Sequence, residues 1–223
     1  MQREIRITGD GYPTFFVPAL NEHYHSIHGA AQESMHVFIQ SGLLYQLAQG
    51  RKQIQLLEVG LGTGLNALLT LQAAEKYQID THYIALEPFP LSANEINKIT
   101  EVPGAFSDEA GHALRLIHAS VHNTPAPLTE HFTFTRVICP LEEYHAPHLF
   151  DLVYFDAFGP QAQPEIWSEA NFKKLFDTMQ PSGVLVTYSA KGAVRRAMEA
   201  AGFITQRIPG PPGKREMLRA IKK

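Results

Sequence analysis

Residues 56–66, with the sequence LLEVGLGTGLN, decide how this chain folds. The stretch places three glycines, Gly60, Gly62 and Gly64, after an apolar run and before a segment with the apolar spacing of a helix. A strand that passes through a glycine-rich turn into a helix is typical of α/β domains, in which a ligand lies against the turn. The first question is therefore which ligand this backbone accepts.

The glycine spacing excludes two nucleotide-binding loops. The dinucleotide fingerprint is Gly-x-Gly-x-x-Gly, and here the third glycine comes one residue early. No Gly-Lys-Ser/Thr follows, so the turn is not a P-loop. The pattern of an acidic residue, then x-Gly-x-Gly-x-Gly, instead resembles the loop of class I S-adenosylmethionine methyltransferases. A purely structural glycine turn is the alternative.

Around this loop, short strand-like runs alternate with helix-like segments, which predicts an α/β fold with a mostly parallel, Rossmann-like sheet. Seven strands are expected, with helices on both faces of the sheet. The expected strands are residues 54–60, 81–88, 131–140, 150–158, 183–189, 203–208 and 216–222. The expected helices are residues 29–49, 66–77, 91–100, 107–119, 164–180 and 192–201, and Pro181-Ser182-Gly183 is expected to end the fifth of them.

The N-terminal region has a different pattern. Residues 4–8 and 14–18 flank the turn-rich GDGYP and predict a small hairpin. We expect residues 1–50 to form this hairpin and a lid-like helical extension. Residues 51–223 are expected to form the Rossmann-like core, and the two together one structural domain.

Composition limits the class of protein. The chain has 223 residues, 44% of them apolar, and a single cysteine, which excludes a disulfide framework and a thiolate metal cluster. No apolar run is long enough to span a bilayer and the N-terminus has no signal-peptide pattern, so we expect a cytoplasmic protein. The net charge is −3, but residues 195–223 contain eight Lys/Arg and two Glu. This basic end is either a phosphate-binding face or a solvated surface.

Acidic residues end three of the expected strands. Glu87 lies 23 residues after Gly64, where a carboxylate can accept both hydroxyls of a ribose. Glu58 is expected near the methionine portion of the cofactor, paired with its ammonium group, and Asn66 is expected among the cofactor-binding residues. Asp156 ends the most apolar strand at the edge of the sheet where ligands bind, which favours a functional role over a merely solvated carboxylate.

Several longer segments resemble one family. They are GLGTGLNAL (60–68), LEPFPL (86–91), FDAFGPQAQPEIWSEANF (155–172), LVTYSAKGAVRRAMEAAGF (185–203) and GPPGKREML (210–218), in this order, with EHYHSIHGAAQES (22–34) upstream. They are similar to the methyltransferase half of the MnmC family of bacterial tRNA-modification proteins, and the resemblance covers nearly the whole chain. It implies S-adenosylmethionine-dependent methylation of the 5-aminomethyl group of a wobble (2-thio)uridine, with tRNA as the partner.

The resemblance also implies roles for single residues. Asp156 would be the catalytic residue, which orients the amine and accepts its proton. The third strand of such enzymes often ends in Gly-Asp, whereas this chain has Cys139-Pro140, so an adenine contact is expected from the backbone around Leu141 or from a side chain such as Glu142. The expected substrate-binding residues are Tyr24, Phe158, Ser189, Arg195, Lys214 and Arg215, the last three through phosphates. Trp167, on an amphipathic helix, is predicted to lie in the core.

A second departure from the family, a group of histidines and two rival functions remain. Bifunctional family members continue into a flavin-dependent oxidase domain, and because this chain ends at Lys223, the resemblance implies methylation alone, without flavin. His23, His25 and His28 have a spacing that can suggest zinc, but no cysteine or acidic cluster completes a site and no metal is expected. The rivals are a methyltransferase or aminopropyltransferase for a small amine, and a noncatalytic RNA-binding module.

Overall fold

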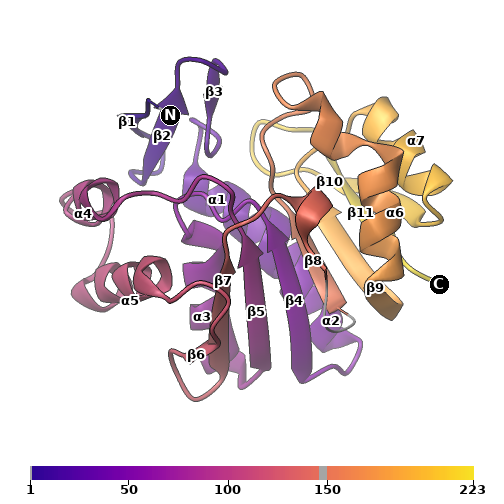
Figure 1. Ribbon diagram of the computed structural model, residues 1–223, viewed down its shortest axis with the longest axis horizontal. Helices are drawn as coiled ribbons and strands as arrows, with labels where there is room; N and C mark the ends of the chain where they lie inside the picture. Colours follow the sequence, from indigo (N-terminus) through magenta and orange to yellow (C-terminus); the bar gives the residue numbers. More distant parts are fainter. Residues whose placement is uncertain (1, 146–149) are drawn as a thin grey trace.

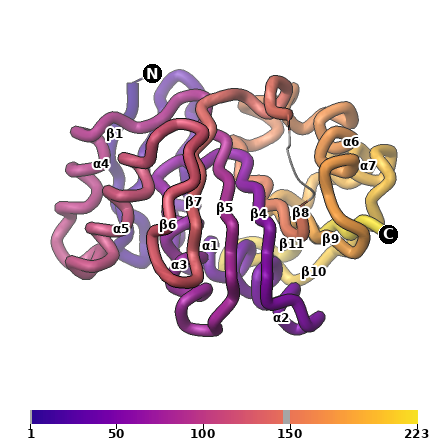
Figure 2. Tube along the Cα trace, turned by 60° about the horizontal axis from the view of Figure 1, so that its bottom comes forward, coloured from indigo at the N-terminus to yellow at the C-terminus, as the bar shows by residue number. Residues whose placement is uncertain are grey.

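The computed structural model describes residues 2–145 and 150–223. Its centre is an eight-stranded sheet with the order β10-β11-β9-β8-β4-β5-β7-β6, whose middle strands run side by side in Figure 2. The parallel strands are β4 (Gln53–Val59), β5 (Asp80–Leu86), β7 (Phe132–Val137), β8 (Phe150–Phe155) and β9 (Met179–Thr187). The antiparallel strands are β10 (Ile204–Pro209), β11 (Glu216–Ile221) and the two-residue β6 (Ala126–Pro127). The seven predicted strands are confirmed, and β6 adds an eighth.

Both faces of the sheet are buried. Neighbouring residues of a strand point to opposite faces, and in the central strands both sets of side chains are apolar. In β4, Leu56 belongs to one apolar cluster and Leu57 to another. In β8, Leu152 and Tyr154 face the first cluster, whereas Val153 faces the second. A strand that is apolar on both faces requires a covering layer of helices on each side.

The covering helices follow the predicted pattern. They are α3 (Leu65–Tyr77), α4 (Ala93–Thr100), α5 (Asp108–Ala119), α6 (Glu169–Asp177) and α7 (Gly192–Ala200). Residues 30–48 form one helical segment, made of α1 (Ala30–Ser34), a π-helical stretch (Met35–Leu43) and α2 (Leu44–Ala48). Figure 1 shows α6 and α7 beside β9, and α4 and α5 at the other end of the sheet.

One predicted helix is wrong in its extent. Residues 164–180 do not form a single helix, because Ser168 is extended and its hydroxyl caps α6 by accepting the N–H of Asn171. The preceding residues form a short 3-10 turn (Pro164–Trp167). The helix ends at Asp177, and Pro181-Ser182-Gly183 lies inside β9 rather than ending a helix.

The N-terminal hairpin is confirmed and gains a third strand. β1 (Glu4–Ile7), β2 (Pro13–Val17) and β3 (Glu22–His23) form a separate antiparallel sheet above the central one (Figure 1). Arg3 ties this sheet to the core, because its guanidinium pairs with Glu95 at 3.1 Å and donates to the carbonyl of Phe89. Movement of residues 1–50 as a lid stays a prediction.

The strand order reverses beside β4. The chain first adds β5 and β7 on one side of β4 and then returns to place β8 and β9 on the other. Ligands bind at such a switch point, at the carboxyl ends of the strands. Val59 and Phe155 are partners at the ends of β4 and β8, so Gly60 and Asp156, which follow them, meet there. Within the described ranges, no helix is long and apolar enough to cross a membrane.

Candidate active site

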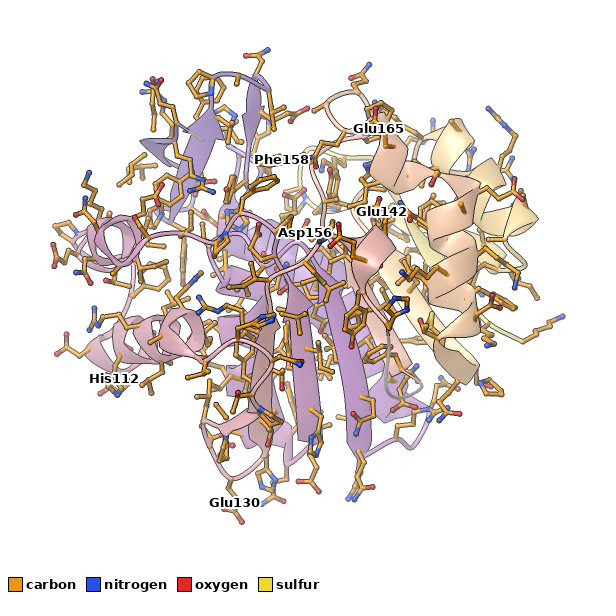
Figure 3. The ribbon with its side chains drawn as sticks, viewed as in Figure 1. His112, Glu130, Glu142, Asp156, Phe158 and Glu165 are labelled. Atoms are coloured by element: carbon orange, nitrogen blue, oxygen red, sulfur yellow. The ribbon has the colours of Figure 1, made fainter. Side chains whose placement is uncertain are left out.

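A cavity of about 610 Å³ opens at the switch point, between the sheet and the N-terminal hairpin. Its walls come from the segment after β3, the glycine loop, and the segments that follow β5, β7, β8 and β9. Figure 3 shows Asp156 and Phe158 at this edge with Glu142 and Glu165 nearby, whereas Glu130 lies at the opposite edge of the sheet. The volume is in the usual range of a small-molecule site.

The glycine loop is shaped by two close approaches. Gly60 has φ of +94°, and a Cβ there would lie 2.6 Å from the carbonyl oxygen of Asp156. Gly62 has φ of +54°, and a Cβ there would lie 3.2 Å from the ring of Tyr24. A side chain at Gly60 would clash with the backbone, one at Gly62 would be strained and crowded, and the loop backbone borders the cavity directly.

Glu87 holds the loop from the neighbouring strand. Its Oε2 accepts the N–H of Gly62 at 3.0 Å and its Oε1 accepts the N–H of Phe89 at 2.9 Å. Burial raises the pKa of this carboxyl, and the two backbone hydrogen bonds counteract the rise. Each oxygen keeps a further lone pair that a ligand hydroxyl can use, since a carboxylate accepts about four hydrogen bonds.

A buried amide joins two carboxyl groups beneath the cavity. The side-chain nitrogen of Asn66 donates to Glu58 at 2.9 Å and to Asp156 at 2.8 Å. Glu58 is fully buried, and this burial raises its pKa well above the ordinary value. Glu58 is not among the residues that line the cavity, and its pairing with the ammonium of a ligand stays a prediction. Asn66 is likewise buried and does not line the cavity, so its part in cofactor binding also stays a prediction.

Asp156 borders the cavity, and the pKa of its carboxyl is shifted far from the ordinary value. Burial raises its pKa to about 7, and the negative charge of Glu33 adds to the rise. The hydrogen bond from Asn66 and the charge of Lys214 act in the opposite direction. A carboxyl that titrates near neutral pH can take up a proton and release it at physiological pH.

Aromatic side chains form one wall of the cavity. The rings of Tyr24 and Phe158 lie edge to face, 5.1 Å apart, and both border the cavity. The Tyr24 hydroxyl accepts a hydrogen bond from Arg3 at 2.8 Å, which fixes the ring above the glycine loop. Trp167 is 5% exposed and packs on Phe155, so its predicted core position is confirmed. Its indole N–H donates to the carbonyl of Phe158.

The segment that follows β7 contributes four residues to the cavity wall: Cys139, Pro140, Leu141 and Glu142. Leu141 is 2% exposed and opens a short 3-10 turn. Glu142 accepts a hydrogen bond from the amide of Asn171 at 2.8 Å. Leu141 lines the cavity, and its contact with adenine stays a prediction.

The predicted phosphate-binding residues lie in different places relative to the cavity. Lys214 borders the cavity, where its ammonium pairs with Glu33 at 2.6 Å. Arg195 pairs with Glu199 on the same helix at 2.7 Å, outside the cavity lining. Arg215 is exposed next to Lys214, and Ser189 is buried and is not among the residues that line the cavity. Their contacts with RNA stay predictions.

His25 lies in the wall as a hydrogen-bonded residue of the hairpin. Its two ring nitrogens lie 3.2 Å from the hydroxyl of Thr14 and 3.3 Å from that of Thr63, and burial lowers its pKa to about 4. In the part of the chain that the structure describes, no group of three or more His, Cys, Asp or Glu residues could hold a metal ion.

Arg3 was missed from the sequence, since no local signal places it beside Tyr24.

Comparisons with known proteins agree with this geometry. Residues 129–223 match a family model described as S-adenosyl-L-methionine-dependent methyltransferase. The tRNA 5-methylaminomethyl-2-thiouridine biosynthesis bifunctional protein MnmC of Aromatoleum aromaticum is 31% identical over 225 residues, which cover 96% of this chain and 34% of that protein. MnmC of Burkholderia thailandensis is 30% identical over 92% of this chain and 33% of its own length. The chain spans about a third of the length of these relatives.

Solved structures show the same fold. MNMC2 from Aquifex aeolicus superposes with a TM-score of 0.81 at 24% identity and covers 100% of this chain and 71% of its own. Spermidine synthase from Thermotoga maritima has a TM-score of 0.51 at 13% identity, over 100% of this chain and 72% of its own. The predicted class I methyltransferase fold is confirmed. The match over residues 129–223 is to the S-adenosyl-L-methionine-dependent methyltransferases, and the chain is similar to MnmC proteins over nearly its whole length.

Proposed function

We propose that this protein transfers a methyl group from S-adenosylmethionine to the amine of a 5-aminomethyl (2-thio)uridine at the wobble position of tRNA. One observation carries the proposal: Asp156, with a pKa of about 7, borders the same cavity as the glycine loop and Glu87. The names of the MnmC relatives, which are tRNA 5-methylaminomethyl-2-thiouridine biosynthesis proteins, support the choice of substrate. This function places the protein in the cytoplasm.

The residues around the cavity fit S-adenosylmethionine. Glu87 has lone pairs for the ribose hydroxyls, Gly60 and Gly62 let the ligand approach the backbone, and the segment at Leu141 can contact the adenine. When bound, the cofactor supplies a methyl group that its positively charged sulfur already activates. The chain's own contribution is to hold the acceptor amine and to manage its proton.

Asp156 manages that proton. An alkylamine resembles lysine, whose reference pKa is about 10.4, so it arrives as an ammonium and must lose a proton before its nitrogen has a free electron pair. The ionised carboxyl of Asp156 accepts this proton directly or through water. The hydrogen bond from Asn66 orients the carboxyl toward the cavity. Positioning of the amine by these groups supplies a further share of the rate.

The RNA would enter over the aromatic wall. Single-stranded bases stack on aromatic side chains, and Tyr24 and Phe158 offer such faces beside Asp156. Arg215 and Lys214, on the loop before β11, and Arg195 on α7 are the proposed phosphate contacts. Ser189, which is buried outside the cavity lining, is proposed to hold the strand end against which the base rests.

Mass spectrometry of tRNA nucleosides tests the proposal. A strain that lacks this protein should accumulate 5-aminomethyl uridine, the wild-type chain should restore the methylated nucleoside, and Asp156→Ala should not. Purified protein should also bind S-adenosylhomocysteine in calorimetry. Unchanged wobble nucleosides would refute the tRNA substrate, and methylation of free alkylamines without RNA would favour a small-molecule amine transferase instead.

A further inference from the structure

Lys214 occupies an unusual place for a surface lysine. Its ammonium lies inside the cavity, 2.6 Å from Oε1 of Glu33 and 4.3 Å from the centre of the Tyr188 ring. An aromatic face together with a carboxylate is the arrangement that binds an alkylammonium ion in proteins. The chain therefore holds one alkylammonium group, its own, within the candidate active site.

The two groups around this ammonium are held independently of it. Oε2 of Glu33 accepts the backbone N–H of Ser26 at 3.0 Å, and the Glu33 side chain is only 12% exposed. The Tyr188 hydroxyl donates to the carbonyl of Ala157 at 2.8 Å, which fixes the ring one residue from Asp156. Both groups therefore keep their places when the lysine leaves.

Lys214 itself is free to leave. Its side chain is 37% exposed, and its loop is fixed through the backbone, where the Lys214 N–H donates to the carbonyl of Pro211. Rotation about side-chain bonds alone would carry the ammonium out of the cavity. The charge of Glu33 raises the pKa of the Asp156 carboxyl and that of Lys214 lowers it. An ammonium group beside Glu33 is therefore near enough to interact with the proposed proton acceptor.

We propose that Glu33 and the face of Tyr188 form a binding niche for the primary ammonium group of the acceptor, which Lys214 fills until the acceptor displaces it. The inference rests on the proposed function and adds the group that recognises the amine. Glu33 binds the charged amine, and Asp156 then takes its proton. Acceptors that lack a cationic amine leave Lys214 in place and gain nothing from the niche.

Binding of two matched RNAs tests the niche without relying on turnover. The probes are anticodon stem-loops that carry 5-aminomethyl uridine or 5-methyl uridine at the wobble position, titrated against the full chain with S-adenosylhomocysteine present at pH 7. The wild-type protein should prefer the aminomethyl RNA by roughly tenfold, because only this RNA has a cationic amine that can replace Lys214 beside Glu33. Equal affinity for the two RNAs overturns the inference.

Three variants locate the preference. Glu33→Gln should reduce the ratio of the two affinities to about one, and an unchanged ratio overturns the niche. Lys214→Met removes the internal competitor and should keep or increase the ratio, whereas a smaller ratio overturns its role as occupant. Glu22→Gln is the matched control, because this carboxylate also borders the cavity and lies near the Tyr188 hydroxyl. It should keep the wild-type ratio, and loss of the ratio only in this variant would move the site away from Glu33.

The methylation assay separates this inference from the proposed function. A wild-type protein that methylates the aminomethyl RNA while Glu33→Gln retains the full affinity ratio refutes the niche alone. A wild-type protein that neither binds S-adenosylhomocysteine nor methylates the RNA refutes both. Thermal unfolding of each variant shows whether a changed ratio reflects misfolding, and an altered ratio in a variant with wild-type unfolding supports the niche.

Discussion

Two aspartates at opposite ends of β8 show how the two edges of the sheet differ. Asp151 is the second residue of the strand, and its carboxylate pairs with Arg51 and accepts the N–H of Gln55 at 2.9 Å. Asp156 follows the end of the strand, where its carboxyl borders the cavity and accepts a hydrogen bond from Asn66. The same side chain thus stabilises the fold at one edge and remains available to a ligand at the other.

The difference follows from what surrounds each carboxyl. At the amino edge, the guanidinium of Arg51 and the backbone N–H of Gln55 satisfy the charge of Asp151, as a buried carboxylate requires. At the carboxyl edge, burial without a directly paired cation raises the pKa of Asp156 to about 7. Of the two aspartates, the one that is costly to ionise is therefore the one that borders the cavity.

The largest expected effect is on catalysis. Asp156→Asn removes the proton acceptor while keeping the size of the side chain, so kcat for RNA methylation should fall by about 10²–10⁴-fold, the usual contribution of a general base. Single-turnover methylation of an aminomethyl stem-loop measures it. Asp151→Asn is the matched control at the other end of the strand and should lose less than about threefold at 25 °C. Equal losses in the two variants would contradict the assigned roles.

The second effect is on the free energy of unfolding, and here Asp151→Asn should have the larger effect and Asp156→Asn the smaller. Asp151→Asn breaks the pair with Arg51 and weakens the hydrogen bond to Gln55, so the free energy of unfolding should fall by about 1–3 kcal/mol at pH 7. Urea unfolding followed by circular dichroism measures it. Asp156→Asn should not destabilise the protein at this pH. A loss of stability in Asp156→Asn as large as that in Asp151→Asn would show that both carboxyls are structural.

The third effect is the pH dependence of stability. Because the pKa of Asp156 is raised in the folded state, its contribution is most favourable below the unfolded value near 3.8 and is lost as the pH rises through about 7. Asp156→Asn should therefore gain stability relative to wild type between pH 4 and pH 8, by about 1–3 kcal/mol. Thermal unfolding at several pH values measures the difference. A constant difference between the two proteins would show that Asp156 has an ordinary pKa in the folded chain.

The contrast between the edges also shows what the sequence can predict. The glycine spacing and the apolar run before Asp156 are local signals, and parallel strands bring their ends together, so the loop, Glu87 and Asp156 were predicted at one site. The break at Ser168 was missed, because the amphipathic pattern of residues 164–180 continues through the capping serine. The burial of Glu58 was also missed, because a strand-end carboxylate gives no sign of which face of the sheet it joins.

Contacts between distant segments were beyond prediction. Arg3 meets Glu95 across 92 positions and Lys214 meets Glu33 across 181 positions. The basic C-terminal segment indicated phosphate contacts, but the sequence does not show that Arg195 and Lys214 each have an acidic partner in the folded chain. Such pairs depend on how the hairpin and the last loop settle on the sheet.

The smallest expected effect concerns the acidity of Asp156 during catalysis. Methylation requires the ionised carboxyl, so kcat/KM should rise with pH through about 7. The hydrogen bond from Asn66 favours the ionised form, and Asn66→Ala should therefore move this rise to higher pH by roughly one pH unit or less, since one unit corresponds to 1.36 kcal/mol.

Five other groups carry charge or titrate near Asp156, and they make the direction of this shift informative. Lys214 favours the ionised carboxyl, whereas Glu33 and any ionised Glu58, Tyr83 or Tyr188 oppose it. Removal of Asn66 also frees Glu58 from its hydrogen bond, which makes Glu58 still harder to ionise and adds no charge beside Asp156. A shift to lower pH in Asn66→Ala would therefore mean that a group other than Asp156 controls the rate. The catalytic role assigned to Asp156 at the carboxyl end of β8 would then be wrong.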